Sequence, residues 1–165
     1  MNLPIAEKKT DQWPQENHDG FHCREHARWA IVFRFLKIDY AYQREHFGLT
    51  AEYGFTPDFN LHDSCYFHCC NGKPSGQTKI SASMVAQKTG MPVAIAQGEM
   101  FIPNYRDTSI MLWYTTGEGV SLIRYLCMNG KAACFKRPLI VQDCVTPRLC
   151  EAFRRALAKW PTSQE

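Results

Sequence analysis

The feature of this sequence that most narrows the fold is a short, unbroken apolar run at residues 93–96. A run of this length without polar alternation is typical of a strand covered on both faces. It follows Gly90 and Met91-Pro92, which are the residues expected where a helix ends. The pattern therefore predicts a central strand in a sheet flanked by helices.

The stretch before this run predicts a helix, three extended segments and a second helix. Apolar residues recur at helical spacing in the first segment, and polar and apolar residues alternate in the second. Turn residues fill positions 71–76, and a helix capped by Ser75 or Thr78 follows them. The first helix is expected at residues 21–38, and the extended segments are expected at 40–47, 55–61 and 65–70.

The last third predicts further strands and a closing helix. Thr146-Pro147 is a helix-start signature, and Leu149, Phe153 and Trp160 supply an apolar stripe after it. The expected strands lie at residues 109–115, 120–128 and 132–136.

With 165 residues, the chain has the size of one domain. Residues 1–19 show neither helical nor strand periodicity and are expected to form a flexible arm. The domain then occupies residues 20–160, with a core at 20–98 and C-terminal strands and helix at 105–160. The predicted class is α/β (α+β), with a mixed central sheet.

Three local strings, in this order and at this spacing, resemble small stand-alone members of the PD-(D/E)XK nuclease superfamily. Together they span about residues 26–98, and the resemblance implies a restriction-endonuclease-like core. Such members are similar to proteins of phages and mobile elements, so the resemblance permits a phage-type accessory or inhibitory role. The strings are Ala27-Arg28-Trp29-Ala30, Phe55-Thr56-Pro57-Asp58-Phe59 and Thr89-Gly90-Met91-Pro92-Val93.

The resemblance also implies where the functional residues of the family would lie. In the family, the aspartate of the Pro-Asp strand and the glutamate of a Glu-x-Lys strand bind a divalent metal, and the lysine orients the attacking water. This chain keeps the aspartate as Asp58, but it has His68 at the glutamate position and Cys70 at the lysine position. On the first helix, His26 takes the place of an acidic residue, with Glu25 beside it. Because Mg²⁺ prefers carboxylate oxygens, these replacements predict weak Mg²⁺ binding.

Three hypotheses follow for the altered site. In the first, the catalytic chemistry is lost and the fold acts as a binding module. In the second, imidazole and thiolate ligands form a softer site for Zn²⁺ or another transition metal. Its four ligands would be His26, Asp58, His68 and Cys70.

The third hypothesis is an active Mg²⁺ nuclease that uses Asp58 and Glu25, with the lysine moved to Lys73 or Lys79.

Two other patterns are weaker metal signals. Residues 62–70 are rich in His and Cys but lack paired CxxC knuckles, so burial of these cysteines is the preferred interpretation. Residues 22–26 match the HxxEH pattern of certain zinc proteases, a five-residue match that recurs by chance.

The formal net charge of +3 permits a nucleic-acid partner. Basic residues predominate near the C-terminus and around the second helix, although a solvated charged face would give the same pattern. The candidates for phosphate contacts are Lys73, Lys79, Lys136, Arg137, Arg154 and Arg155.

The sequence contains neither an export signal nor an apolar run long enough to cross a bilayer, so we expect a cytoplasmic protein without a membrane partner. The expected function is therefore binding to nucleic acid, or to a protein that handles nucleic acid, by a nuclease-like fold with an altered metal centre. The alternatives are an active nuclease with a His/Cys/Asp site and a zinc-stabilised protein-interaction module.

Overall fold

The computed structural model describes residues 19–43, 45–51, 53–61, 65–101, 112–123, 128–129, 132–133 and 147–162. Its main feature is a six-stranded sheet with the strand order β1-β4-β5-β6-β7-β8. Strands β5 and β6 run parallel, while the other four neighbouring pairs are antiparallel. The strands are β1 (Tyr40–Tyr42), β4 (Phe59–Leu61), β5 (Cys65–Cys70), β6 (Val93–Gln97), β7 (Leu112–Thr115) and β8 (Ser121–Ile123).

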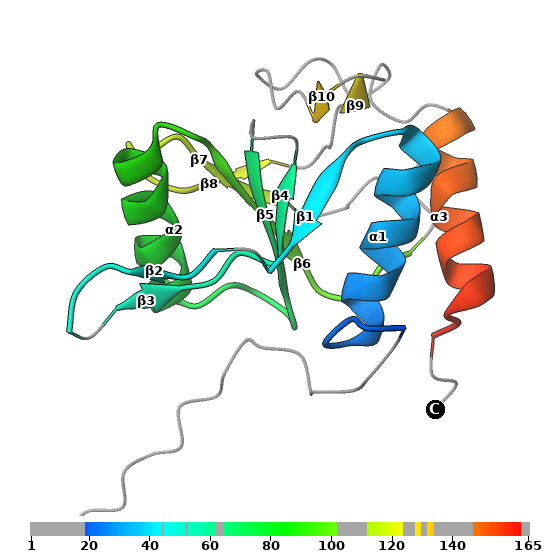
Figure 1. Ribbon diagram of the computed structural model, residues 1–165, viewed down its shortest axis with the longest axis horizontal. Coiled ribbons are helices and arrows are strands. Elements are labelled where there is room, and N and C mark those ends of the chain that lie inside the picture. Colours follow the sequence, from blue (N-terminus) through cyan, green and yellow to red (C-terminus); the bar gives the residue numbers. More distant parts are fainter. Residues whose placement is uncertain are drawn as a thin grey trace, which may run out of the picture.

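Three helices cover the two faces of this sheet (Figure 1). Helix α1 (Arg24–Leu36) and helix α3 (Pro147–Lys159) lie side by side on one face, and α2 (Gly76–Thr89) lies on the other. The mixed sheet flanked by helices predicted from the sequence is confirmed. The short apolar run at residues 93–96 forms most of β6 and is buried between the two layers, as expected.

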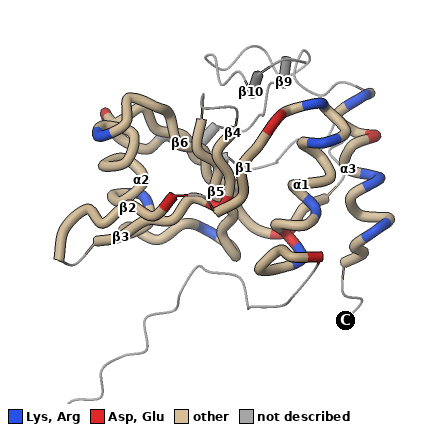
Figure 2. The backbone as a smooth tube through the Cα atoms, in the orientation of Figure 1, with Lys and Arg blue, Asp and Glu red and all other residues tan. Residues whose placement is uncertain are grey.

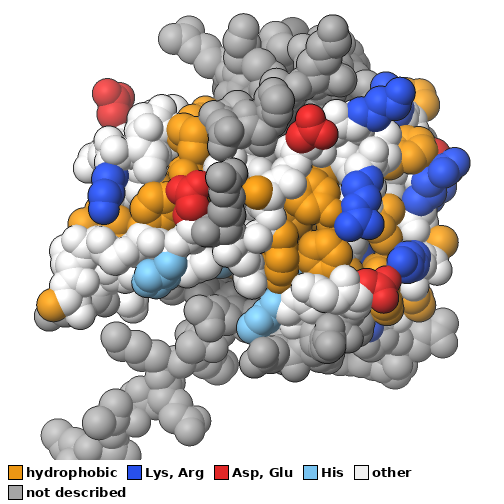
Figure 3. Space-filling view, in the orientation of Figure 1, with side chains coloured by type: hydrophobic (Ala, Val, Ile, Leu, Met, Phe, Trp, Pro, Cys, Tyr) orange, Lys and Arg blue, Asp and Glu red, His pale blue; other side chains and the backbone are white. Residues whose placement is uncertain are grey.

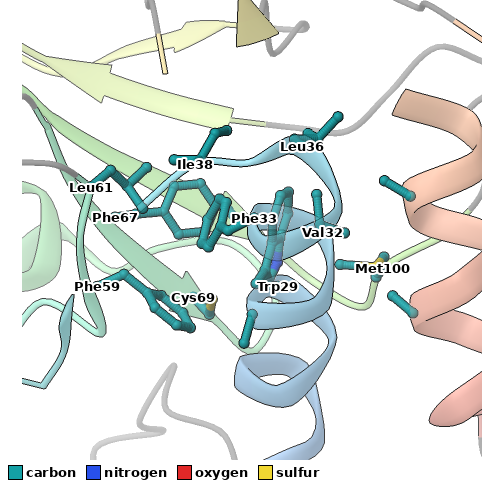
Figure 4. Close-up of a cluster of buried hydrophobic side chains, with 14 of the residues drawn as sticks. Trp29, Val32, Phe33, Leu36, Ile38, Phe59, Leu61, Phe67, Cys69 and Met100 are labelled. Atoms are coloured by element: carbon teal, nitrogen blue, oxygen red, sulfur yellow. The ribbon is translucent and has the colours of Figure 1, made fainter. Parts of the chain in front are cut away.

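Alternation along β5 divides the core into two clusters. Cys65, Phe67 and Cys69 face α1 and α3, whereas Tyr66 and Cys70 face α2. Figure 4 shows the first cluster, in which aromatic rings from the sheet and from α1 pack against one another. The α1 helix thus presents its apolar face to one side of β5, and the polar residues near its first turn lie close to the end of that strand.

Two predicted strands are divided in the structure. The strand expected at residues 40–47 ends at Tyr42, and Gln43 then adopts a φ of 42°. The strand expected at residues 55–61 is interrupted by Pro57, which has no N–H to donate to a ladder. The pieces left over, β2 (Phe47–Gly48) and β3 (Gly54–Phe55), pair with each other as a separate hairpin.

The helix boundaries agree closely with the sequence signals. Ser75 caps α2, because its Oγ accepts a hydrogen bond from the backbone N–H of Thr78 at 3.0 Å. Gly90 ends α2 in the left-handed conformation, with a φ of 71°. Pro147 begins α3, as the cap-and-proline signature predicted.

The remaining C-terminal predictions are covered only in part. β7 begins at Leu112 and β8 ends at Ile123, inside the strands expected at residues 109–115 and 120–128. β9 (Met128–Asn129) and β10 (Ala132–Ala133) pair with each other. The arm expected at residues 1–19 lies outside the described residues except for Asp19, as do residues 102–111, 124–127 and 134–146. Among the described residues, we find no helix long and apolar enough to cross a membrane.

Candidate metal centre

Asp58 lies immediately before β4 and is buried, with 4% of its surface exposed. Phe59 pairs with Phe67 in the antiparallel β4–β5 ladder, so continuing the register places Asp58 opposite His68. The backbone N–H of Cys69 donates to Oδ2 of Asp58 at 2.6 Å. The carboxylate therefore extends the β4–β5 ladder through its side chain and is held at the level of the sheet.

Two histidines approach this carboxylate from different elements. Nε2 of His26, on α1, lies 3.2 Å from Oδ1 of Asp58. Nδ1 of His68, on β5, lies 2.9 Å from Oδ2, in an ionic contact that is not aligned as a hydrogen bond. The structure thus brings together Asp58, His68 and His26, the three positions at which the family resemblance placed metal-binding residues.

Tyr42 fixes the orientation of the His26 ring. Its hydroxyl accepts a hydrogen bond from the backbone N–H of His22 at 2.8 Å, and it lies 2.8 Å from Nδ1 of His26. The donor in this second contact is set by the tautomer of His26, and Nε2 faces Asp58. Metal-binding histidines likewise have a polar partner at the ring nitrogen that does not bind the metal.

The thiol that lies within metal-binding distance of His26 and Asp58 is that of Cys69, whereas the predicted ligand Cys70 contacts His68. The ligand atoms of His26, Asp58 and Cys69 all lie within 4.8 Å of one another, so this buried trio could hold a metal ion. Cys70 is fully buried in the cluster that faces α2. Figure 4 shows Cys69 beside Phe59, on the side of β5 that faces α1.

The physical reason for this difference is the position of Asp58 immediately before its strand. The resemblance assigned His68 and Cys70 to the two positions of the Glu-x-Lys strand, which alternation places on one face of β5, and both were therefore expected beside Asp58. The carboxylate instead bonds to the backbone of Cys69, so side chains from both faces of the sheet reach it. Tyr42 and Cys69 were missed for this reason, since neither belongs to the motif of the family.

Glu25, the predicted acidic alternative on the first helix, is engaged elsewhere. It forms a buried ion pair with Arg28 and accepts a hydrogen bond from the backbone N–H of Met100 at 3.1 Å. Arg28 also donates to Glu99 at 2.9 Å and to the carbonyl oxygen of Trp160 at 2.7 Å. Burial raises the pKa of Glu25, against the lowering effect of Arg28. Glu25 and Arg28 together thus join α1 to the segment after β6 and to Trp160, just after α3.

Asp58, His26 and His68 shift one another's pKa values. Burial alone would lower the pKa of His26, but its hydrogen bond to Asp58 raises that pKa to about 9. For Asp58, burial raises the pKa, but the two histidines outweigh it and hold the pKa well below its usual range. Burial would also lower the pKa of His68, which the charge of Asp58 raises instead. Without metal at neutral pH, the carboxylate is therefore ionised between two protonated imidazoles.

The thiol of Cys69 is protonated under the same conditions. Burial raises its pKa, and the nearby negative charges of Asp58 and Glu25 raise it further. A metal ion at the trio would have to displace this proton and that of His26, so binding is expected to release protons and to strengthen as the pH rises.

A cavity of about 120 Å³ opens beside the cluster. His22, Gln43 and Thr56 complete its walls, and Asp58 is the one carboxylate among its described lining residues. The space is large enough for several water molecules or for a phosphate-sized group. We call it the Asp58 cavity.

Four of the predicted nucleic-acid-binding residues belong to the described part of the chain and lie in two separate regions. Figure 2 shows basic positions along both α2 and α3. Lys79 lies in the first turn of α2 and Lys73 in the turn before this helix, and both ammonium groups lie near the ring of Trp113 on β7. Arg154 and Arg155 lie on the exposed side of α3 and both contact Glu151, at 3.7 Å and 2.9 Å. Figure 3 shows basic side chains over the α1 and α3 side of the molecule.

Two other predicted residues, Lys136 and Arg137, lie outside the described residues, and so does His62 of the weak zinc-finger pattern. In the second pattern, residues 22–26, the two histidine rings lie 5.9 Å apart, and the intervening Glu25 is paired with Arg28. Glu25 is therefore engaged as an ion-pair partner within the protein core.

Comparisons of the chain with protein-family models, curated proteins and solved structures found no match.

Proposed function

We propose that this protein is a cytoplasmic, remodelled member of the PD-(D/E)XK group that binds nucleic acid without cleaving it in the presence of Mg²⁺. The observation that carries the proposal is the surroundings of Asp58. One carboxylate oxygen faces His26, and the other accepts the N–H of Cys69 and faces His68. The Asp58 cavity lies where a nuclease centre would be expected in this group. Its described lining residues, however, include no second carboxylate to hold Mg²⁺.

The order of elements supports the same proposal. An opening helix, a first strand, the Pro-Asp strand, the next strand, a second helix and a parallel strand occur in this order as α1, β1, β4, β5, α2 and β6, with the β2–β3 hairpin inserted between β1 and β4. The residues at the three expected metal positions converge although they come from three elements, which is how a site inherited with its fold would be arranged.

For the cofactor, we propose Zn²⁺ or a similar transition metal bound by His26, Asp58 and Cys69. An imidazole nitrogen, a carboxylate oxygen and a thiolate sulfur are all ordinary zinc ligands, and three of them leave a fourth position open. The hydroxyl of Tyr42 at the other ring nitrogen of His26 fits a metal-binding histidine. When bound, the metal would supply Lewis-acid polarisation of a phosphate oxygen or a water.

A cleavage assay tests the lack of Mg²⁺-dependent activity. Purified protein is incubated with single-stranded and duplex DNA and RNA in the presence of Mg²⁺, Mn²⁺ or Zn²⁺, beside an Asp58→Ala variant. We expect no cleavage with Mg²⁺ above the level of the variant. Cleavage by the wild type that Asp58→Ala abolishes would refute the proposal and establish instead a nuclease with a His/Cys/Asp site.

Binding measurements test the nucleic-acid role. We expect binding that weakens steeply as salt is raised, because phosphate contacts release counterions. If the protein binds no DNA or RNA at low salt, the nucleic-acid role is wrong and a protein partner remains. If zinc raises stability while nucleic acid does not bind, the protein is a zinc-stabilised interaction module.

Two neighbouring cysteines offer a matched test of the metal site. Co²⁺ bound by a thiolate gives a sulfur-to-metal charge-transfer absorption, which we expect in the wild type and in Cys70→Ser but not in Cys69→Ser. Both residues are buried on β5, but they face opposite sides of the sheet. Equal loss in both variants, or retention in both, would contradict the assignment of Cys69 as the ligand.

A further inference from the structure

Two lysine ammonium groups lie over the ring of Trp113, on β7. Nζ of Lys79 lies 3.6 Å from the ring centroid, and Nζ of Lys73 lies 5.9 Å from it. The indole Nε1–H donates to Oε1 of Gln97 at 2.8 Å, which fixes the ring plane. Trp113 is half-buried at the margin of the core cluster that faces α2.

The two lysines have no counter-charge within the described part of the chain, where no carboxylate lies at ion-pair distance from either ammonium. By contrast, Arg154 and Arg155 on α3 each contact Glu151. Two like charges that share one aromatic ring repel each other, and an anion between them would relieve that repulsion. Lys73 and Lys79 are therefore better placed than the arginines of α3 to accept a phosphate.

The strand register connects this cluster to the Asp58 cavity. His68 on β5 pairs with Ile95 on β6, and Ile95 pairs with Trp113 on β7. The three residues thus lie in one row across the sheet, and their side chains project from the same face. With neighbouring strands about 4.8 Å apart, Trp113 lies roughly 10 Å from His68. This separation is short enough for one nucleic-acid strand to reach both places.

We propose that Trp113, Lys73 and Lys79 form a subsite for one nucleotide of a single-stranded nucleic acid, with the phosphate on the two ammonium groups and the base stacked on the indole. The subsite deepens the proposed function and rests on it. A single strand is required because only an unpaired base can present its face to a side chain.

The present position of Lys79 is compatible with this role. Its ammonium lies over the ring that the base would occupy, at a site where a cation–π contact stabilises the free protein only weakly. Base stacking on an aromatic ring is the stronger of the two interactions, and the phosphate gives the displaced ammonium a charged partner. Binding should therefore move Lys79 from the ring to the phosphate.

The test is fluorescence anisotropy of a labelled oligothymidylate and of a duplex of equal length, measured across a salt series. Trp113→Ala should weaken binding of the single strand about 5- to 150-fold, the range for loss of one stacked base. Trp113→Phe should retain most of the affinity, because it keeps a ring. Lys79→Gln should lower the slope of log affinity against log salt by about 0.7, which corresponds to one phosphate contact on a single strand.

Lys88→Gln is the matched control, because it removes an exposed lysine from the same helix, in its last turn. Thermal melting of each variant separates lost binding from lost folding. The subsite is wrong if Trp113→Ala binds like the wild type, if Lys88→Gln reduces binding as much as Lys79→Gln, or if the duplex is preferred. In those cases the proposed function stands, whereas a wild type that binds no nucleic acid overturns both.

Discussion

Replacing Asp58 by Asn should change how the stability of this protein depends on pH. The substitution keeps the shape of the side chain and removes its charge. In the wild type, the hydrogen bond to Asp58 raises the pKa of His26 from 6.5 to about 9, although burial opposes it. The folded protein therefore holds a proton on His26 that the unfolded chain begins to lose above pH 6.5.

The sign and size of the effect follow from proton linkage. Because the folded-state pKa is higher than the unfolded value, the stabilisation is complete below pH 6.5 and is lost as the pH rises through about 9. Each pH unit in this window costs up to about 1.4 kcal/mol, so the wild type should lose about 2 kcal/mol between pH 6.5 and 8.5. His68, whose pKa Asp58 also raises, adds to the loss in the same direction.

Asp58→Asn should lack this slope. Without the carboxylate, burial dominates and lowers the pKa of His26, so the imidazole stays neutral throughout the window. The variant should be clearly less stable than the wild type at pH 6.5, and the difference should shrink by about 2 kcal/mol at pH 8.5. Below pH 6.5, its stability should fall as the pH is lowered, because the unfolded histidine gains a proton more readily.

The assay is urea unfolding at half-unit steps from pH 6 to 8.5, with a chelator present so that no metal competes for the histidines. Asp39→Asn is the control, because it removes the charge of an exposed aspartate outside the cavity. We expect Asp39→Asn to keep the slope of the wild type. A wild type whose stability is flat from pH 6.5 to 8.5, or an Asp58→Asn variant with the same slope, would refute the reasoning.

Three further substitutions test the fold around the site by urea unfolding. Arg28→Ala should destabilise by about 3–5 kcal/mol, because it leaves the buried carboxylate of Glu25 unpaired; a loss below 1 kcal/mol would contradict the buried pair. Phe67→Ala should cost about 3–5 kcal/mol through the cavity it opens in the α1-facing core, and an unchanged midpoint would contradict that packing. Gly117→Ala should also destabilise the protein, because Gly117 has a φ of 108° and an added Cβ would lie 2.6 Å from Cγ of Gln87. Gly72→Ala is the control, because Gly72 also has a positive φ but has open space around it.

The fold class could be predicted from the sequence because its strongest signals are local. The apolar run at residues 93–96 indicated a strand buried on both faces, and β6 is that strand. Ser75 and Gly90 marked the two ends of α2 through cap chemistry that depends only on neighbouring residues. The division of residues 40–47 could not be predicted, because alternation continues past Tyr42 while the backbone turns at Gln43.

The candidate site was predictable in part, and its partial success has a physical reason. Asp58 and His68 were expected together, and the β4–β5 register places them opposite each other. The choice between Cys69 and Cys70 depended on where the carboxylate lies relative to the sheet, which alternation does not specify. Glu25 was open as a ligand until the structure placed Arg28 and the N–H of Met100 beside it, contacts that span up to 75 residues.

The contacts of Asp58 also decide how variants of this site must be interpreted. Asp58 immediately precedes β4. Its carboxylate connects this strand to α1 through His26 and to β5 through the side chain of His68 and the backbone of Cys69. Asp58→Ala removes all of these contacts and leaves buried donors without an acceptor, so a loss of binding in that variant mixes chemistry with folding. Asp58→Asn keeps an oxygen for the Cys69 N–H and changes mainly the charge. Comparing the two variants at pH 8.5, where the charge contributes less to stability, therefore separates the role of the carboxylate in the site from its role in the fold.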